Sequence, residues 1–239
     1  MDFTDSVALV TGASSGLGRH ISAALVERGA TVYGLARSTD TLSAMQDDLG
    51  DAFQPVPCDV RDDDQVDAAF DALHDAHGRL DVLVNNAGLG QFGPVDELSL
   101  DAWDVQMDTN LRGVFLCTRR AVPLMRAQND ETGFGGHILN VASIAGLIGN
   151  PNISAYNTTK FGLRGFSASL MKEVRDDGIR VTCLYPGSID TNFFDVAGVD
   201  MTDNPLAPED VTATMMHVLE SPPNHLISEV VIRPLRPRG

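Results

Sequence analysis

Residues 6–25 read Ser-Val-Ala-Leu-Val-Thr-Gly-Ala-Ser-Ser-Gly-Leu-Gly-Arg-His-Ile-Ser-Ala-Ala-Leu, and this stretch decides the fold. Its first part, Val7 to Val10, is a short continuous apolar run, which predicts a fully buried strand. Apolar residues then recur at helical spacing from Ile21, and Gly29 ends that pattern. The glycines between the two elements therefore occupy a turn from a strand into a helix.

Three glycines of this turn, Gly12, Gly16 and Gly18, have the spacing G-x-x-x-G-x-G. Glycine allows a tight bend and lets the backbone approach a pyrophosphate group, which then lies at the N-terminus of the helix. A plain turn in an α/β protein is the alternative explanation. The strand before the glycines and the helix after them favour a dinucleotide-binding site.

The end of the second strand-like run, Thr31 to Arg37, indicates which dinucleotide binds. A site for NAD usually places Asp or Glu about 20 residues beyond the glycines, to hold the ribose 2′-hydroxyl group. Ala36 and Arg37 stand there instead. A guanidinium group binds phosphate through charge-assisted hydrogen bonds, whereas a carboxylate would repel it. An ordinary surface charge is the alternative explanation of Arg37, but we predict that the cofactor is NADP.

Tyr156 and Lys160 lie four residues apart in Ser-Ala-Tyr-Asn-Thr-Thr-Lys, and Ser143 lies 13 residues before Tyr156. If Ser154 starts a helix, the phenol and the ammonium group project from the same face. A nearby cation favours the phenolate, so we expect Lys160 to lower the pKa of Tyr156 from ~10. Such a tyrosine can give a proton to a carbonyl oxygen or take one from an alcohol. The pair alone is weak evidence, because helices carry such pairs by chance.

Five motifs occur together in an order and at spacings that are typical of one family. They are Thr11 to Gly18; Cys58-Asp59-Val60; Asn85-Asn86-Ala87-Gly88; Asn110 with Ser143, Tyr156 and Lys160; and Pro186-Gly187 followed by Thr191. On these motifs the chain resembles the short-chain dehydrogenase/reductases along nearly its whole length. Within that family it is similar to NADP-preferring members of the 3-oxoacyl-acyl-carrier-protein reductase type.

The resemblance implies a role for each matching residue. Tyr156 would be the catalytic acid and base, and Lys160 would lower its pKa and hold the nicotinamide ribose. Ser143 would bind the substrate oxygen, and Asn110 would hold a water molecule of a proton relay. The residues that would bind the cofactor are Gly12, Ser14, Ser15, Gly16, Leu17, Gly18, Arg37, Asp59, Val60, Asn86, Ala87, Gly88, Tyr156, Lys160, Pro186, Gly187, Ile189 and Thr191.

Parts of this set would meet different parts of the cofactor. Asp59 and Val60 would flank the adenine, and the stretch Asn86 to Gly88 would line the groove. Ile189 and Thr191 would meet the carboxamide end of the nicotinamide. The six histidines make no metal-ligand spacing, so no metal site is expected.

Strand-like runs alternate with helical patterns throughout the chain. Strands are expected at 7–11, 31–36, 53–57, 82–85, 137–143, 179–185 and 230–233, and helices at 17–28, 40–49, 63–76, 101–128, 154–176 and 208–220. This alternation predicts an α/β, single-domain Rossmann fold: a doubly wound, seven-stranded parallel sheet with helices on both faces. No repeat or flexible linker divides the chain, so we expect one dinucleotide-binding and catalytic domain over residues 1–239. A short substrate lid is expected at 191–208, where a glycine and a proline indicate a mobile, fairly open cover.

The chain is strongly acidic. It has 33 acidic against 17 basic side chains, a formal net charge of −16, and only two lysines. Such a charge keeps a protein soluble where salt screens its self-repulsion, as in halophiles. We therefore predict a halophilic protein, with an ordinary acidic cytosolic protein as the alternative. Nucleic acid and anionic membrane surfaces are poor partners in either case.

Other sequence features point to a cytoplasmic protein. No apolar stretch approaches the ~20 residues that span a bilayer, and the N-terminus has no signal-peptide pattern. Cys58, Cys117 and Cys183 are widely spaced in apolar patterns, which is typical of buried residues rather than disulfides or metal ligands.

Together these features predict an NADPH-dependent oxidoreductase that reduces a ketone or a 3-oxoacyl thioester to an alcohol, with Tyr156 as the proton donor. The resemblance points to the thioester, but a fold alone does not choose among carbonyl compounds. One alternative is a dehydrogenase of a secondary alcohol or sugar, against which Arg37 argues because NADP pools usually drive reduction. A non-catalytic dinucleotide sensor is another, but it would not need the complete catalytic set. Candidate substrate contacts, for which loop packing is an equally good explanation, are Gln91, Phe92, Ile144, Ala145, Asn150, Phe193 and Phe194.

Two long amphipathic helices, expected at 101–128 and 154–176, mostly face the sheet. In the family that the chain resembles, these helices also build a subunit interface. A homodimer or homotetramer is therefore expected.

Overall fold

The apolar run after Ser6 forms the strand at the centre of a parallel sheet. The computed structural model describes residues 2–198, 203–222 and 224–236. Strand β1 (Val7–Thr11) is buried along its whole length. It pairs in parallel with β2 (Thr31–Ala36) on one side and with β4 (Val82–Asn85) on the other. Helices cover both faces of this strand, and its sequence accordingly lacks the alternation of apolar and polar residues.

The described strands make one seven-stranded sheet in the order β3-β2-β1-β4-β5-β6-β7, and every pair is parallel. The remaining strands are β3 (Phe53–Pro57), β5 (Gly136–Val141), β6 (Ile179–Pro186) and β7 (Glu229–Ile232). The helices are α1 (Gly16–Glu27), α2 (Thr39–Leu49), α3 (Asp63–His77), α4 (Leu100–Met107), α5 (Gly113–Thr132), α6 (Ser154–Val174), α7 (Phe193–Ala197) and α8 (Pro208–Leu219). The strand order reverses between β1 and β4, and open α/β sheets bind ligands beyond the carboxyl ends of the strands at such a point.

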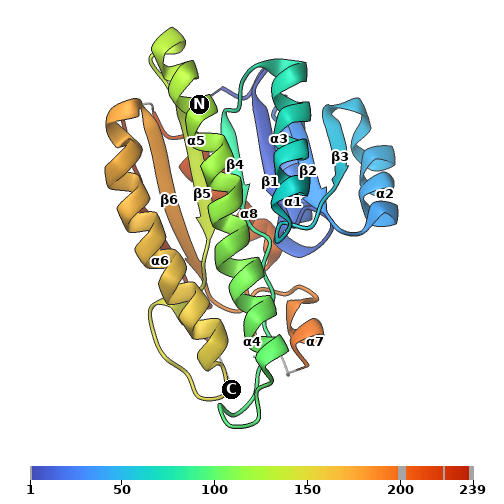
Figure 1. Ribbon diagram of the computed structural model, residues 1–239, viewed down its shortest axis with the longest axis vertical. Helices are drawn as coiled ribbons and strands as arrows, with labels where there is room; N and C mark the ends of the chain where they lie inside the picture. Colours follow the sequence, from blue (N-terminus) through green and yellow to red (C-terminus); the bar gives the residue numbers. More distant parts are fainter. Residues whose placement is uncertain (1, 199–202, 223, 237–239) are drawn as a thin grey trace.

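Helices lie on both faces of the sheet, as Figure 1 shows. On one face α1, α2 and α8 enclose a core that includes Val10 and Val32. On the other face α3, α5 and α6, the layer nearer the viewer in Figure 1, enclose a core that includes Leu9 and Leu83. The predicted doubly wound, seven-stranded Rossmann fold is therefore confirmed.

Most predicted elements agree with the observed ones to within two residues at their ends, and two of the differences affect the site. The strand expected at 137–143 is Gly136–Val141, so Ser143 lies beyond the end of the strand. The helix expected at 101–128 consists of α4, a π turn at Asp108–Arg112 and α5. A π turn adds one residue to a helix without ending it, so the apolar periodicity of the sequence did not reveal it.

The segment expected to be a lid contains a short helix, α7, that the sequence did not predict. Residues 199–202 of this segment lie outside the described residues. The two ends of the segment are held together, because Asp190 N–H donates to the Leu206 carbonyl oxygen (2.9 Å) and Leu206 N–H donates to that of Ser188 (2.8 Å).

A buried carboxylate joins three elements at the end of the sheet opposite the carboxyl ends. Asp81, 1% exposed, accepts hydrogen bonds from the Val7 N–H (2.9 Å), the Gln128 amide (3.0 Å) and the Arg79 guanidinium group. The same carboxylate raises the pKa of Arg79. A buried charge is tolerated only where such partners replace water. Asp81 therefore ties the starts of β1 and β4 to α5.

His137 is fully buried in β5 and is held as a neutral imidazole. Its Nε2 lies 2.8 Å from the Thr182 hydroxyl, which donates its own hydrogen to the Ile227 carbonyl oxygen (2.6 Å). Because a hydroxyl group has one hydrogen, His137 Nε2 must carry the hydrogen of this pair. Its Nδ1 is then the unprotonated nitrogen, and it has no partner among the described residues. Burial, with the nearby Arg180 charge, lowers the pKa of His137 to about 3.

We predict that His137 makes the fold sensitive to acid. The unfolded chain binds a proton on this histidine near its ordinary pKa of 6.5, whereas the folded chain binds it only near pH 3. The contribution of His137 to stability is therefore complete above pH 6.5 and is lost as the pH falls towards 3. The loss amounts to up to ~1.4 kcal/mol per pH unit.

The measurement is the free energy of urea unfolding between about pH 7 and pH 4 for the wild type, His137→Gln and the exposed control His77→Gln. We expect a shallower dependence on pH in His137→Gln alone. Equal slopes in the three proteins would contradict the prediction.

Candidate active site

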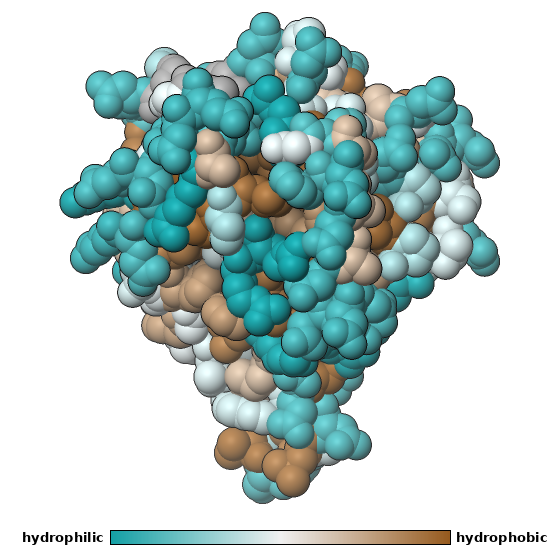
Figure 2. Space-filling view, turned by 45° about the horizontal axis from the view of Figure 1, so that its top comes forward, coloured by the Kyte–Doolittle hydropathy of each residue, from teal (hydrophilic) through white to brown (hydrophobic). Residues whose placement is uncertain are grey.

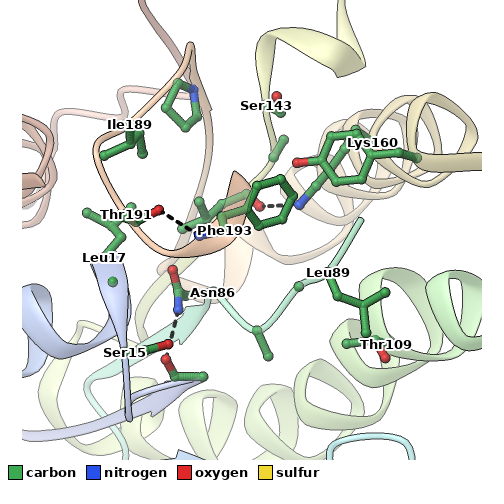
Figure 3. Close-up of a pocket in the computed structure, with 18 of the residues that line it drawn as sticks. Ser15, Leu17, Asn86, Leu89, Thr109, Ser143, Lys160, Ile189, Thr191 and Phe193 are labelled. Carbon is green, nitrogen blue, oxygen red and sulfur yellow. Dashed lines mark hydrogen bonds between the residues drawn. The ribbon is translucent and has the colours of Figure 1, made fainter. Parts of the chain in front are cut away.

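A cleft of about 590 Å³ opens at the carboxyl ends of the strands. Segments that follow β1 to β6 line it, and Figure 3 shows how their side chains face one another. Among the predicted catalytic and cofactor residues, those that line the cleft are Gly12, Ser14, Ser15, Gly16, Leu17, Arg37, Asp59, Val60, Asn86, Ala87, Gly88, Ser143, Tyr156, Lys160, Pro186, Gly187, Ile189 and Thr191. Among the predicted substrate contacts, those that do so are Phe92, Ile144, Ala145, Asn150, Phe193 and Phe194.

Three predicted site residues, Gly18, Asn110 and Gln91, do not line the cleft. A Cβ atom at Gly18 would lie 2.1 Å from the carbonyl oxygen of Gly12, so glycine there lets the turn close. Asn110 lies behind the loop that follows β4. The carbonyl oxygen of Gln91 accepts a hydrogen bond from the Gln106 amide (3.1 Å) and so anchors that loop.

The turn between β1 and α1 can receive an anion. Gly12 and Gly16 have φ angles of +66° and +48°, in the left-handed region that favours glycine. No side chain caps the start of α1 after Ser15, and the first turn carries no acidic residue. Its free N–H groups and the helix dipole therefore favour a negative group. The pyrophosphate of a dinucleotide fits this environment.

A threonine that sequence analysis did not single out fastens the end of β4 to this turn. The Thr11 hydroxyl oxygen accepts hydrogen bonds from the N–H groups of Asn86 and Ala87, each at 3.0 Å. The Asn86 amide donates in return to the carbonyl oxygens of Thr11 (3.0 Å) and Gly12 (3.3 Å). The glycine turn and the loop after β4 therefore form one unit.

The charged residues gather at the other end of the cleft, after β2 and β3. Arg37 and Asp59 line it as predicted, together with Arg61, which sequence analysis missed. Arg61 Nε donates to both Asp59 carboxylate oxygens, at 2.9 and 3.0 Å. The hydrogen bonds from Arg61, and to a smaller extent the charge of Arg37, lower the pKa of Asp59. Two guanidinium groups and one carboxylate leave a net positive charge, which suits a phosphate group.

Burial sets the protonation of Tyr156 and Lys160. It raises the pKa of Tyr156 to about 12, an effect that the Ser143 side chain opposes, and it lowers the pKa of Lys160 to about 8. The Lys160 ammonium group donates to the Val141 carbonyl oxygen (3.0 Å) and lies over the Tyr156 ring, 5.5 Å from its centre. The expected lowering of the Tyr156 pKa is therefore not found in the chain without a bound cofactor, because burial of the phenol raises this pKa. That Lys160 lowers it in the complex stays a prediction.

Asn110 lies in the π turn and joins the loop after β4 to α6. Its side-chain oxygen accepts from the Leu89 N–H (2.9 Å), and its nitrogen donates to the Leu89 carbonyl oxygen (2.8 Å) and the Thr159 hydroxyl (3.1 Å). Thr159 donates to the carbonyl oxygen of Tyr156 (2.8 Å). Asn110 thus positions the backbone on two sides of the cleft. That it also holds a water molecule stays a prediction.

A second asparagine holds the loop after β5 and was not anticipated. The Asn157 amide donates to the carbonyl oxygens of Ala145 (2.6 Å) and Ile148 (2.8 Å), and its oxygen accepts from the Asn150 N–H (3.1 Å). The loop therefore has three attachments to α6. A polar residue after Tyr156 is also typical of a solvated helix face, so no signal in the sequence pointed to this role.

The start of the lid segment lies at this end of the cleft, beside Tyr156. The Phe193 ring centre lies 5.7 Å from that of Tyr156. In the view of Figure 3, Phe193 lies between Thr191 and Lys160. The expectation of a mobile, fairly open cover stays a prediction, and the described part of the segment adds that an aromatic side chain packs against the tyrosine.

The cysteines are free and buried, as predicted. Cys58 lines the cleft, and burial together with the charges of Asp59 and Asp62 raises its pKa to about 11. It is therefore a thiol at neutral pH and a poor nucleophile. Among the described residues, no group of three or more His, Cys, Asp or Glu side chains is placed to hold a metal ion.

Known proteins share this sequence and geometry. The family described as short chain dehydrogenase matches residues 6–200. An uncharacterized oxidoreductase of Staphylococcus aureus (strain USA300) is 32% identical over 234 residues, which cover 97% of this chain and 98% of that protein. The 3-ketoacyl-(acyl-carrier-protein) reductase of Brucella melitensis, complexed with NADH, has a TM-score of 0.89 at 27% identity, covering 98% of this chain and 99% of that one. A metagenomic short-chain oxidoreductase in complex with NADP has a TM-score of 0.85 at 32% identity, covering 99% and 100%.

We expect Asn157→Ala to loosen the loop after β5 and to leave the glycine turn unchanged. The Asn150 N–H loses its acceptor, and two carbonyl groups lose their donor. Hydrogen–deuterium exchange should become ~10-fold faster in peptides covering residues 144–150 and should stay the same in residues 12–18. Thr158→Ala, at the exposed neighbouring position of the same helix, is the matched control. Unchanged exchange over residues 144–150 in Asn157→Ala would count against this assignment.

Proposed function

Since the chain belongs to the short-chain dehydrogenase family, we propose that it is an NADPH-dependent reductase of carbonyl compounds. The observation that carries the proposal is that Tyr156 and Ser143 line one end of the cleft, while Arg37 lines the other. An extended dinucleotide bound along the cleft would then place its reactive end near Tyr156.

The residues around the glycine turn suit the cofactor. The uncapped start of α1 suits a pyrophosphate, and the glycines let the turn pack closely against Ala87 and Thr191. A Cβ atom at Gly88 would lie 3.6 Å from Lys160 Nζ, so glycine there keeps the space beside the ammonium group free. Lys160 is then available to hold the nicotinamide ribose.

Arg37 supports the choice of NADP over NAD. The two solved structures above contain NADH and NADP respectively, so similarity alone does not decide. At the end of β2 this chain has a guanidinium group where an NAD site has a carboxylate. Arg61 neutralises Asp59, the carboxylate beside it. A 2′-phosphate is thus attracted at this end of the cleft.

The protonation of Tyr156 suits the role of proton donor in a reduction. When bound, the reduced nicotinamide would supply a hydride to the carbonyl carbon. Tyr156 would give its proton to the carbonyl oxygen, because its raised pKa keeps the phenol protonated at neutral pH. Ser143 would donate a second hydrogen bond to that oxygen as its negative charge grows. The reverse oxidation would use the same residues with the phenolate as the base, so the choice of reduction rests on the NADP preference that Arg37 indicates.

We also propose a setting for the enzyme: a homodimer or homotetramer in the cytoplasm of a halophile. Phe115 on α5 and Phe161 on α6 are 49% and 42% exposed, which supports an interface on these helices. Figure 2 shows mostly hydrophilic side chains on the face in view, consistent with a net charge of −16. No described helix has both the length and the apolar character needed to cross a membrane.

Arg37→Gln should weaken the binding of NADPH and leave that of NADH nearly unchanged. Loss of a charge-assisted hydrogen bond costs ~1.5–3 kcal/mol, so the Kd for NADPH should rise about 10- to 100-fold. Calorimetric titration with both cofactors measures this. Arg28→Gln, at the far end of α1, serves as the control for removing a positive charge. A preference for NADH in the wild type would mean that Arg37 has been misinterpreted.

Tyr156→Phe should bind NADPH like the wild type and lose turnover by about 10²- to 10⁴-fold, as expected for removal of a general acid. The measurement is the initial rate of NADPH oxidation in molar potassium chloride, with an acetoacetyl thioester and a panel of ketones. Reduction of the thioester by the wild type would support the 3-oxoacyl substrate. A wild type that binds NADPH and reduces no member of the panel would favour the dinucleotide sensor instead.

A further inference from the structure

Three aromatic rings meet at the substrate end of the cleft. The ring centres of Phe92 and Tyr156 lie 5.5 Å apart, those of Tyr156 and Phe193 5.7 Å apart, and those of Phe92 and Phe193 6.4 Å apart. These distances are in the range at which tilted and edge-to-face rings attract one another. We call Phe92, Tyr156 and Phe193 the aromatic triangle. It places apolar ring surface directly beside the ring of Tyr156.

Phe92 is the fixed wall of the triangle, because the backbone on both sides of it is anchored. The Gln106 amide donates to the carbonyl oxygen of Gln91 (3.1 Å). The N–H of Gly93 donates to the carbonyl oxygen of Asn152 (2.7 Å). A wall held in this way needs little ordering when a ligand binds, and such preorganisation favours affinity.

Gly90 makes room for this arrangement. A Cβ atom at this position would lie 2.5 Å from the Phe92 ring and 3.1 Å from the Phe193 ring. Any side chain at position 90 would therefore push both rings. The glycine gives a way to disturb the triangle without removing an aromatic group.

Phe193 is the second wall and belongs to α7, the helix that begins the lid segment. Its N–H donates to the Thr191 hydroxyl (3.4 Å), and its ring meets Phe194 edge-on at 5.7 Å. Phe193 lines the cleft, and in Figure 3 its ring lies on the side of Thr191 that faces Lys160. A planar group that packs against the exposed side of these rings would make contacts of the same kind as the rings make with one another.

The triangle lies far from the cationic end of the cleft. The charged residues that line the cleft are Arg37, Asp59 and Arg61 after β2 and β3, and Lys160 on α6. Two strands separate β2 from β5, the strand that leads to Ser143, which is about 14 Å across the sheet. The Lys160 ammonium group is already bonded to the Val141 carbonyl oxygen. This ammonium group also lies 5.5 Å from the centre of the Tyr156 ring, and in the proposed function it holds the nicotinamide ribose. A carboxylate bound beside the triangle would therefore lose water and share its one nearby cation with the cofactor, which is costly.

We propose that the aromatic triangle selects a neutral carbonyl compound with a planar aromatic or conjugated group attached to the carbonyl carbon, such as an aryl ketone or an aryl α-keto ester. The inference rests on the proposed carbonyl reduction and names its substrate class. In the reaction a hydride from NADPH forms the new C–H bond, and the electron pair of the C=O bond moves to the oxygen. That oxygen takes the proton of Tyr156, so the products are a secondary alcohol and NADP.

The first test compares three substrates that differ in one group at a time: ethyl benzoylformate, benzoylformate and ethyl pyruvate. With NADPH as the reductant, kcat/KM for ethyl benzoylformate should exceed that for the carboxylate by about 100-fold or more. The kcat/KM for ethyl benzoylformate should also exceed the kcat/KM for ethyl pyruvate by about 10- to 100-fold, because burying an apolar group as large as a ring stabilises the bound state by about that factor.

Variants of the pocket residues show whether the preference for the aryl ester comes from the pocket or from the substrates' own reactivity. In Phe92→Ala, Phe193→Ala and Gly90→Ala, the ratio of kcat/KM for ethyl benzoylformate to that for ethyl pyruvate should fall by about 10-fold. Phe193→Leu, which keeps an apolar side chain, should show an intermediate ratio. Val231→Ala, at an exposed apolar position of β7, is the control and should keep the wild-type ratio.

Binding without turnover gives an independent readout. Calorimetric titration of ethyl benzoylformate into the NADPH complex of Tyr156→Phe should show binding that Phe193→Ala in the same background weakens by about 10-fold. Benzoylformate should bind at least 100-fold more weakly than its ester.

The outcomes separate this inference from the proposed function. Reduction of ethyl pyruvate or benzoylformate at least as efficient as that of ethyl benzoylformate would overturn the aromatic pocket and leave carbonyl reduction standing. A substrate ratio that the Phe92 and Phe193 variants do not change would also overturn it. If no carbonyl compound is reduced, the proposed function fails, and calorimetry still decides whether the triangle binds the aryl ester.

Discussion

The hydrogen bonds of the Thr11 hydroxyl group hold the two sides of the site together. Thr11 and Asn86 are 75 residues apart in sequence, and two successive N–H groups at the end of β4 donate to that one oxygen. Asn110, in the π turn, bonds to Leu89 of the same loop and to Thr159 on α6. Thr159 in turn bonds to the backbone of Tyr156. Losing one partner of a buried hydrogen bond costs free energy. This connected set therefore fixes the tyrosine relative to the glycine turn.

Burial and charge divide the cleft into two different environments. At the end after β2 and β3, Arg37 and Arg61 lie beside one carboxylate, and the net charge attracts phosphate. At the other end, burial keeps Tyr156 protonated and brings the pKa of Lys160 down to about 8. In a protein with a net charge of −16, the cleft thus carries two guanidinium groups and one carboxylate at one end and the Lys160 ammonium group at the other.

The sheet and most of the residues that line the cleft could be predicted from the sequence. Alternating apolar runs and helical patterns determine a parallel sheet, and in such a sheet residues that follow different strands meet at one edge, as Gly12, Asp59 and Ser143 do. Other features depend on packing that no local pattern records. The contacts of Asn157 and the position of Phe193 arise only from loops meeting in space. The direction of the Tyr156 pKa depends on how deeply the phenol is buried, which spacing along a helix does not reveal.

The π turn at Asp108–Arg112 has a consequence for how the chain tolerates insertions and deletions. Each residue of an α-helix turns it by about 100°. Removing one residue from this turn would let the helix become regular, and α4 would rotate by that angle relative to α5. Asn110 would then face away from the loop that it holds. A deletion or insertion in the middle of this helix would therefore disturb the site. The same change at either end of the helix would leave Asn110 in place.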